Sequence, residues 1–380
     1  MPTTARVLGL SLGALTLAGL TACGSGTTTE ASAGPGKPGK ITVAASDTDC
    51  KVAATEVTAG TSTFTITNGG TKVTEFYVYA PGDRVMAELE NIVPGLTREL
   101  VAELPAGTYE AVCKPGMVGK GIRNPLKVTG DHKPLSQDVK LADAIASYKR
   151  YIKSQSDTLL VKTQEFADAV KAGDLAKGKE LYPVARTYWE RIEPVAEIFG
   201  ELDPAIDARE ADLAAGEKWT GFHKIEKDLW ITKDVSKDGP VADKLVADVK
   251  TIVAKSNAAE LTPLNLANGA KGLLDEVASG KITGEEDIWS HTDLWDFDAN
   301  LQGSKAAVQA LRPVLEERSP DLVKTLDEQF AAAEAALGAH RKGDGWKLHN
   351  ELSKAELKSL SDAINALAEP ISKIAPIVAK

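Results

Sequence analysis

The sequence predicts a two-domain protein in which an all-β sandwich is followed by an all-α helical bundle. From residue 41 to residue 130, short segments of alternating apolar and polar residues are separated by Gly, Asn and Pro turns. From residue 135 to residue 380, apolar residues recur instead at helical spacing over long stretches. The 380 residues are enough for two or three domains of ordinary size.

The first 40 residues are set apart from both predicted domains. Arg6 precedes an apolar run over residues 7–20 that is too short to span a bilayer, and Cys23 follows it in the sequence Leu-Thr-Ala-Cys. Residues 1–22 have the pattern of a secretion signal, and residues 20–23 resemble a bacterial lipobox. We therefore expect a lipid on Cys23 and a flexible tether over residues 23–40. An uncleaved anchor or an ordinary signal peptide is the alternative.

About seven short strands are predicted for the sandwich. The alternating segment 61–67 ends at an Asn-Gly-Gly turn, and the segment 74–79 ends just before Pro81. The other predicted strands are 41–43, 84–89, 96–102, 108–113 and 126–129. Turns at this spacing favour two sheets packed face to face.

Eight helical segments are predicted for the bundle. They are 135–172, 175–199, 204–231, 241–257, 265–279, 299–316, 320–339 and 346–368. Pro204 and Pro320 each follow a residue that can cap a helix N-terminus, namely Asp203 and Ser319. Residues 131–134 join the bundle to the sandwich.

The composition excludes some functions. The net charge is −10 and no long run of Lys or Arg occurs, which argues against binding to nucleic acid. The helical zinc-peptidase motif His-Glu-x-x-His is absent, because Lys227 stands four residues after His223. We therefore expect no catalytic residues and predict a binding protein. The alternative is a metal-dependent peptidase whose metal site differs from this motif.

Cys50 and Cys113 both lie in the predicted sandwich and allow two interpretations. As thiolates they could form a metal site with Glu75, and such a site would accept iron, copper or zinc. A blue-copper centre is not expected, because it needs two imidazoles and the nearest His is His132, past the last strand. Two cysteines in an exported β-domain also commonly form a disulfide, which would stabilise the domain by about 4 kcal/mol.

The stretch from Trp219 to Trp230 is predicted to be a helix with an imidazole and a carboxylate on one face. His223 and Glu226 are one turn apart, and they share this face with both tryptophans. A buried polar pair needs a partner, and a metal ion suits an imidazole beside a carboxylate. A simple His–Glu contact on the helix surface is the alternative.

Further ligands would have to come from facing helices. The acidic candidates are Glu190 and Glu193 on the preceding helix, Asp207 among the acids that follow it, and Asp293 in the acidic, aromatic stretch 285–298. A groove for an acidic polysaccharide is a second interpretation of the bundle. Its aromatic lining would consist of Trp219, Trp230, Trp289 and Trp295.

The residues Gly221 to Glu226 resemble the Gly-x-His-x-x-Glu signature of imelysin-like domains, and the segments 182–194 and 290–294 are similar to the same family. A β-domain with Cys50, Glu75 and Cys113 placed before such a bundle resembles the EfeO family. These proteins are the extracytoplasmic components of EfeUOB iron-uptake systems. The resemblance covers nearly all of the chain after the tether.

This resemblance implies a cupredoxin-like sandwich and an imelysin-like bundle that binds rather than cleaves. Its implied cargo is ferrous or ferric iron, held in the bundle by His223 and Glu226. In the sandwich it implies a site of Cys50, Glu75 and Cys113, with copper or zinc as other occupants. The expected partners are a membrane iron permease, which receives the captured iron, and a secreted haem peroxidase. The lipobox adds the expectation of a lipid anchor at the outer face of the cell membrane.

Overall fold

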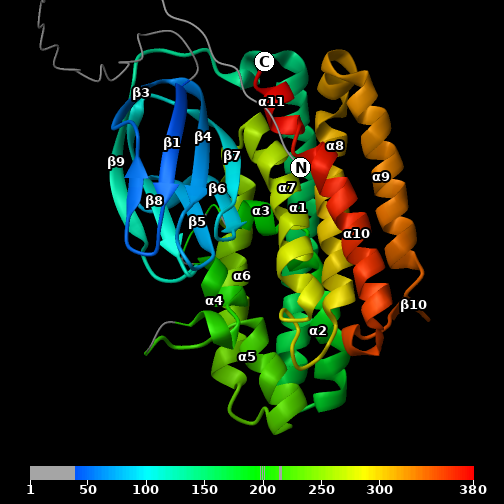
Figure 1. Cartoon of the computed structure of the whole chain (residues 1–380). Coiled ribbons are helices and arrows are strands. Elements are labelled where there is room, and N and C mark those ends of the chain that lie inside the picture. Colours follow the sequence, from blue (N-terminus) through cyan, green and yellow to red (C-terminus); the bar gives the residue numbers. More distant parts are fainter. Residues whose placement is uncertain (1–38, 197, 199, 201, 214–215) are drawn as a thin grey trace, which may run out of the picture. The chain divides into compact units, whose positions relative to one another are not determined.

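The computed structural model describes residues 39–196, 198, 200, 202–213 and 216–380 (Figure 1). The predicted signal sequence, Cys23 and the tether as far as residue 38 lie outside these residues. Nine strands between residues 39 and 129 come first, and helices follow from residue 135 to residue 378. The prediction of a β-sandwich followed by a helical bundle is therefore confirmed.

Two sheets form the N-terminal domain. The four-stranded sheet has the order β2 (Cys50–Val52), β1 (Gly39–Ala45), β4 (Gly60–Asn68) and β7 (Thr97–Leu104). The five-stranded sheet has the order β3 (Glu56–Thr58), β9 (Ile122–Thr129), β8 (Gly107–Pro115), β5 (Thr74–Ala80) and β6 (Arg84–Ile92). The sequence analysis missed β2 and β3, which are only three residues long and therefore show almost no alternation.

Alternating side chains build the core between the two sheets. Phe64 on β4 and Phe76 on β5 are fully buried, and their ring centroids lie 5.3 Å apart. Strand β5 is unusual because it is buried on both faces. Successive residues of a strand point to opposite faces, so Tyr77 and Tyr79 lie on the outer face of the sheet, away from Phe76. The two tyrosine rings stack there with centroids 5.1 Å apart.

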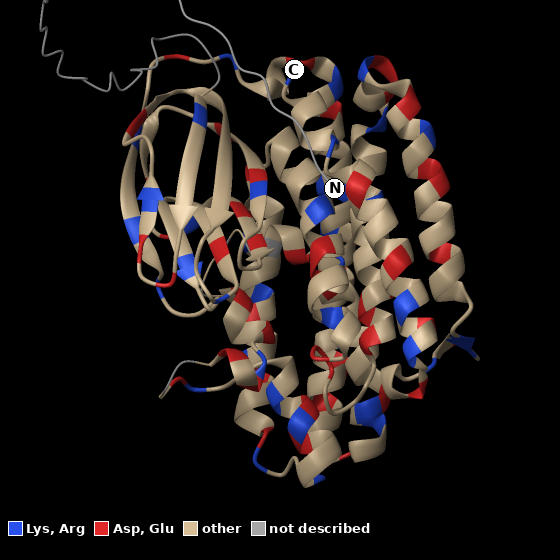
Figure 2. Ribbon diagram, viewed as in Figure 1, with Lys and Arg blue, Asp and Glu red and all other residues tan. Residues whose placement is uncertain are grey.

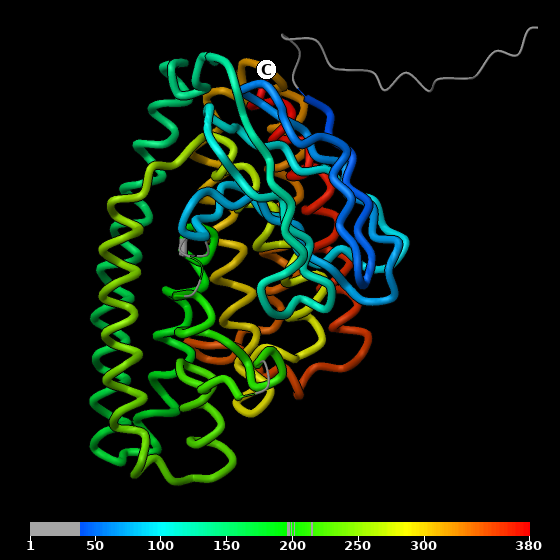
Figure 3. The backbone as a smooth tube through the Cα atoms, turned by 90° about the vertical axis from the view of Figure 1, so that its left-hand side faces the viewer, coloured from blue at the N-terminus to red at the C-terminus, as the bar shows by residue number. Residues whose placement is uncertain are grey.

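The C-terminal domain is a bundle of long helices with shorter helices between them. The helices are α1 (Val139–Lys171), α2 (Leu175–Glu190), α3 (Glu193–Ala196), α4 (Leu202–Asp207), α5 (Phe222–Lys227), α6 (Gly239–Ala258), α7 (Pro263–Ser279), α8 (Asp293–Arg318), α9 (Pro320–Gly338), α10 (Lys354–Ile371) and α11 (Ile374–Val378). Helices α1 and α6 run side by side (Figure 3), and α7 packs against α8. A two-stranded ribbon of β10 (Arg341–Lys342) and β11 (Gly345–Trp346) joins α9 to α10.

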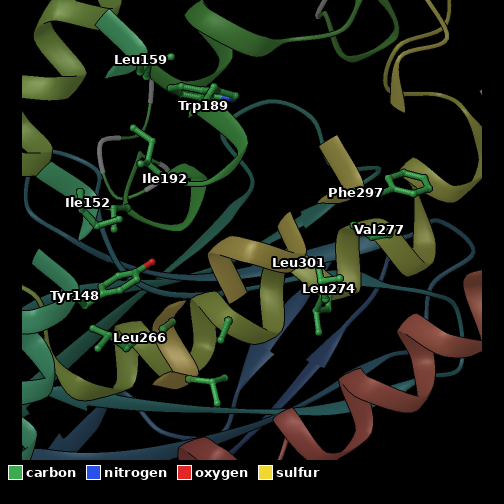
Figure 4. Packing of buried hydrophobic residues seen from close by; sticks show 14 of the residues in the cluster. Tyr148, Ile152, Leu159, Trp189, Ile192, Leu266, Leu274, Val277, Phe297 and Leu301 are labelled. Atoms are coloured by element: carbon green, nitrogen blue, oxygen red, sulfur yellow. The ribbon is translucent and has the colours of Figure 1, made fainter. Parts of the chain in front are cut away.

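Capped ends and one continuous apolar core fix these helices. The Asp138 side chain accepts hydrogen bonds from the first turn of α1, and Thr262 and Ser353 form capping boxes at α7 and α10. Figure 4 shows buried side chains of α1, α2, α7 and α8 packed against one another, among them Tyr148 and Trp189. Burial of this apolar surface is the main source of stability for such a bundle.

Two of the predicted helices are interrupted. The predicted helix 204–231 is wrong, because α4 ends at Asp207 and α5 begins only at Phe222. Gly221 has a φ of 92°, and a Cβ at this position would lie 2.1 Å from the carbonyl oxygen of Ile206, so a regular helix cannot run through it. Trp219 therefore precedes the helix and does not share its face with His223. The predicted helix 175–199 is likewise divided into α2 and α3.

Charged side chains on the outer helices follow an ordinary pattern. Figure 2 shows acidic and basic residues interspersed along α9 and α10, and pairs such as Lys358 and Asp362 are four residues apart and exposed. Exposed pairs of this kind contribute at most about 1 kcal/mol each. Among the residues that the structure describes, no helix combines the length and apolar content needed to cross a bilayer.

Candidate metal centre

A cluster of buried charged side chains lies inside the bundle, where several short segments meet the long helices. Its members share almost complete burial and come from α2, α4, α5, the loop before α8, and α8 itself. They are Tyr182, Arg186, Glu190, Asp207, His223, Glu226, Glu286, Asp287, Asp293 and Asp296. His223, which the sequence singled out, lies in the middle of the cluster and is 0% exposed.

The break at Gly221 creates this centre. Because Gly221 lets the start of α5 approach the end of α4, the His223 ring lies beside Asp207. The Nε2 atom of His223 is 3.6 Å from Oδ1 of Asp207 and 3.4 Å from Oε1 of Glu286. The same Nε2 atom is buried and has no hydrogen-bond partner among the described residues. One imidazole nitrogen and two carboxylate oxygens therefore converge on one position.

The other imidazole nitrogen is held by Glu226. His223 Nδ1 is 3.1 Å from Oε2 of Glu226 and 3.1 Å from the hydroxyl of Tyr182. The second oxygen of Glu226 accepts hydrogen bonds from the backbone N–H groups of Trp289 at 3.1 Å and Ser290 at 2.7 Å. Both oxygens of Glu226 are therefore occupied. One oxygen orients the imidazole, and the other binds the loop before α8 to α5. In metal sites, carboxylates in this position fix the ring and its tautomer.

Neighbouring charges decide the protonation of His223. Burial and the Arg186 guanidinium oppose a charged imidazole, but the carboxylates of Asp207, Glu226 and Glu286 outweigh them and raise the pKa of His223 to about 10. Burial raises the pKa of Asp207 to about 6, although Arg186 and His223 act against this. At neutral pH the imidazole is therefore protonated, and a metal that binds Nε2 has to displace a proton.

Two carboxylates at the start of α8 are buried with unused hydrogen-bonding capacity. Both oxygens of Asp296 and Oδ2 of Asp293 have no hydrogen-bond partner among the described residues. Oδ1 of Asp293 accepts a hydrogen bond from the backbone N–H of Asp287 at 3.3 Å. Burial, together with the charge of Asp287, raises the pKa of Asp293 and of Asp296 well above the usual range. Buried carboxylates without hydrogen-bond partners are costly, and either a proton or a bound cation offsets that cost.

A second acidic group lies beside the first and is neutralised by a lysine. The buried Lys281 ammonium is 2.5 Å from Oε2 of Glu190, 3.2 Å from Oε2 of Glu193 and 3.2 Å from Oε2 of Glu276. Glu190 and Glu193 also lie close enough to Asp207 to share a cation with it. The two glutamates therefore belong to the same charged region as His223, and Lys281 already serves them as a partner.

The sequence located some of these residues and missed others. It paired His223 with Glu226, and it placed Glu190, Glu193 and Asp293 in the same region. It named Asp207 only among several acids after the preceding helix and Glu286 only as part of the stretch 285–298, and it identified neither as a carboxylate that faces Nε2 of His223. Within the acidic stretch 285–298, no periodicity distinguishes the inward Glu286 from its exposed neighbour Glu285. The break at Gly221, which brings Asp207 beside His223, was not predicted.

The sandwich does not form the predicted cysteine site. Cys50 and Cys113 form a disulfide with a Cα–Cα distance of 5.7 Å, so neither supplies a thiolate for iron, copper or zinc. Cys113 lies opposite Phe76 in the sheet and points into the core, and Glu75 therefore points to the outer face. There Glu75 accepts a hydrogen bond from the Tyr77 hydroxyl at 3.1 Å. The expectation of a shared Cys50–Glu75–Cys113 site is thus corrected, and the disulfide interpretation is the one found.

The four tryptophans do not form one continuous groove. The rings of Trp219 and Trp289 lie 5.7 Å apart, and the Lys227 ammonium is 5.6 and 5.4 Å from their centroids. Trp230 instead packs against the ring of Tyr182 at 5.6 Å. Trp295 lies elsewhere, against β11 at Gly345.

Comparison with known proteins agrees with this architecture. The family model described as imelysin matches residues 144–374, and the model of a cupredoxin-like domain matches residues 14–122. Proteins named "Iron uptake system component EfeO" from Escherichia coli K12, Escherichia coli O157:H7 and Shigella flexneri are each 37% identical over 344 residues, which is 88% of this chain and 90% of theirs. A solved structure from Parabacteroides distasonis gives a TM-score of 0.47 at 12% identity, over 66% of this chain and 97% of that one.

Proposed function

The chain belongs to the imelysin family and to its EfeO relatives, the iron uptake system components, and from this premise we propose that its bundle captures iron at His223. One observation carries the proposal. Nε2 of His223, which makes no hydrogen bond among the residues that the structure describes, faces carboxylate oxygens of Asp207 and Glu286 in a buried site. A single imidazole with hard carboxylate oxygens is a donor set that suits iron.

Each residue around the cargo has a separate task. Asp207, His223 and Glu286 offer the ligand atoms. Glu226 holds the imidazole through Nδ1 and keeps Nε2 directed at the two carboxylates. When iron binds, the proton on Nε2 leaves, and Glu226 remains as the acceptor for the proton on Nδ1. No covalent step is involved, so the function is binding and release.

The captured iron would then be delivered to a membrane iron permease. A lipid on Cys23 and a tether over residues 23–40 would hold the bundle near the outer face of the membrane. Tethering raises the effective concentration of a binder at the mouth of a transporter. A secreted haem peroxidase of the same system would be a second partner. Labelling with a fatty acid, compared between the natural chain and Cys23→Ala, tests the anchor. Loss of the label in the variant is expected, and retention would contradict a lipid on Cys23.

Anaerobic titration calorimetry of the purified chain with ferrous iron, ferric citrate and zinc tests the binding site. The variants are His223→Ala and Glu286→Gln. The matched control is Glu285→Gln, because Glu285 is the exposed neighbour of Glu286 and, among the described residues, forms its ion pair with Arg209 at 3.0 Å. We expect iron binding to be lost in both site variants and kept in the control. Full iron affinity in His223→Ala would contradict the proposal.

An acidic sugar polymer is the second candidate ligand. The half-buried rings of Trp219 and Trp289, with Lys227 over both, offer stacking surfaces and a cation to a uronate. Titration of tryptophan fluorescence with polyuronate, for the natural chain and for Trp289→Ala, tests this candidate. Quenching that disappears in the variant would support it, and no change in the natural chain would contradict it.

A further inference from the structure

The Arg186 side chain lies at the centre of the buried carboxylates. It comes from α2, is 0% exposed, and is among the largest fully buried side chains of the described chain. Its guanidinium nitrogens face five acidic side chains. These are Glu190, Asp207, Glu286, Asp287 and Asp296. An arginine cannot lose its proton in a protein, so this positive charge is permanent.

Arg186 contacts the same oxygen atoms that face the free imidazole nitrogen. Its Nη1 pairs with Oδ1 of Asp207, and its Nη2 lies 2.9 Å from Oε1 of Glu286. Those two oxygens are also the ones at 3.6 and 3.4 Å from Nε2 of His223. A cation bound by His223, Asp207 and Glu286 would therefore share its ligand oxygens with the guanidinium and would lie next to its positive charge.

The structure also offers the guanidinium a second position. Within the described part of the chain, Nε of Arg186 makes no hydrogen bond, and it lies 3.5 Å from Oδ1 of Asp287 and 3.6 Å from Oδ1 of Asp296. Both oxygens of Asp296 are likewise buried without hydrogen-bond partners among the described residues. A small movement of the guanidinium toward Asp296 would satisfy both groups and would free Asp207 and Glu286.

We propose that Arg186 is an internal counter-cation that competes with iron for Asp207 and Glu286 and so keeps iron binding reversible. This inference rests on the proposed function. Without iron, the guanidinium holds the carboxylates together. When iron binds, the Arg186 guanidinium releases the oxygens of Asp207 and Glu286 and pairs with Asp296. The positive charge that remains beside the ligands weakens iron binding, which a protein that must hand its cargo to a transporter requires.

The test compares Arg186→Met, Arg186→Lys and the natural chain by competition with a colorimetric ferrous chelator under anaerobic conditions. Arg191→Met is the matched control, because Arg191 ends the same helix but bonds neutral partners, Gln155 and Gln302. We expect Arg186→Met to bind iron at least about tenfold more tightly and to release it more slowly. Its unfolding temperature should fall in the presence of chelator and recover when iron is added.

Lysine keeps the charge but contacts fewer carboxylates at once, so Arg186→Lys should bind iron with an affinity between those of the natural chain and Arg186→Met. The Arg186→Lys variant also replaces Arg186→Met in this comparison if Arg186→Met does not fold without iron. Equal or weaker iron binding in the folded variants would overturn the inference. If the natural chain binds iron and His223→Ala does not, that result would leave the proposed function standing. If the natural chain binds no iron, both fail together.

Discussion

The sandwich and the bundle both gather residue types that bind metals, and they use them in opposite ways. In the sandwich, Cys50 and Cys113 bond to each other, and Glu75 points to the other face of its sheet. In the bundle, Nε2 of His223 and both oxygens of Asp296 are buried and make no hydrogen bond to any residue that the structure describes, although carboxylates and a guanidinium lie close to them. The comparison teaches that suitable residue types are not enough. A binding site needs donor atoms that the fold brings together at one position.

The strongest test of this contrast removes the disulfide. In the double variant Cys50→Ser, Cys113→Ser, the sandwich should lose about 4 kcal/mol of unfolding free energy, because a loop of this length is no longer closed in the unfolded chain. Iron affinity should stay the same, because the ligands lie in the bundle. Denaturant unfolding and iron titration of the same sample measure both quantities. A large loss of iron affinity in a folded variant would show that the cysteines take part in binding.

The next effect is the stabilisation of the bundle by its cargo. At a free iron concentration about 100 times the dissociation constant, binding should stabilise the native chain by about 2.7 kcal/mol. For a bundle of this size that corresponds to about 5 to 10 °C in the unfolding temperature. His223→Ala should show no such shift, whereas His132→Ala, which replaces a histidine that lies outside the centre and beside Glu103, should keep it. Calorimetric scans with iron and with chelator provide the measurement.

Glu226 should have a smaller effect than His223, because we assign it an orienting role. Glutamine at this position can still accept from the backbone of Trp289 and Ser290, but it no longer stabilises a proton on Nδ1 of His223. We expect Glu226→Gln to weaken iron binding about 10- to 100-fold, as changes to such supporting groups do. Complete loss of binding, equal to that in His223→Ala, would indicate that Glu226 is itself a ligand.

The fold could be predicted because its signals are local. Alternation over 61–67 identified β4, the Pro-Gly turn bounded the segment 74–79 that forms β5, and apolar periodicity identified α1, α7 and α9. The predicted helix 204–231 failed at Gly221, whose requirement for a positive φ depends on the carbonyl of Ile206 in another segment. No window of sequence contains that contact.

The candidate centre could be predicted only in part, because some of its residues are brought together by contacts between distant segments. His223 and Glu226 are one helical turn apart, and so their proximity follows from spacing. Asp207 and Glu286 come from segments whose approach depends on the break at Gly221 and on the loop tied down by Glu226. The cysteines show the reverse case, since residue types suggested a site and the alternation of β5 and β8 separated Glu75 from Cys113.

The smallest expected effect concerns Glu75 on the outer face of the sandwich. Burial raises the pKa of Glu75, although Lys114 acts against this. A carboxyl with a raised pKa contributes most to stability when it is protonated, and this contribution falls as the pH rises from its ordinary pKa through the folded one. Glu75→Gln, which stays neutral, should therefore be slightly more stable than the natural chain at pH 7, with no difference near pH 4. Thermal unfolding across this range checks the sign, and a variant that is less stable at pH 7 would contradict it.

X-ray absorption of the iron-loaded chain tests the central claim most directly, because it distinguishes sulfur from nitrogen and oxygen ligands. We predict a shell of oxygen donors with one imidazole, no sulfur, and loss of the imidazole contribution in His223→Ala. A sulfur shell around iron would contradict the assignment of iron capture to the bundle, because every cysteine and methionine of the chain precedes residue 135.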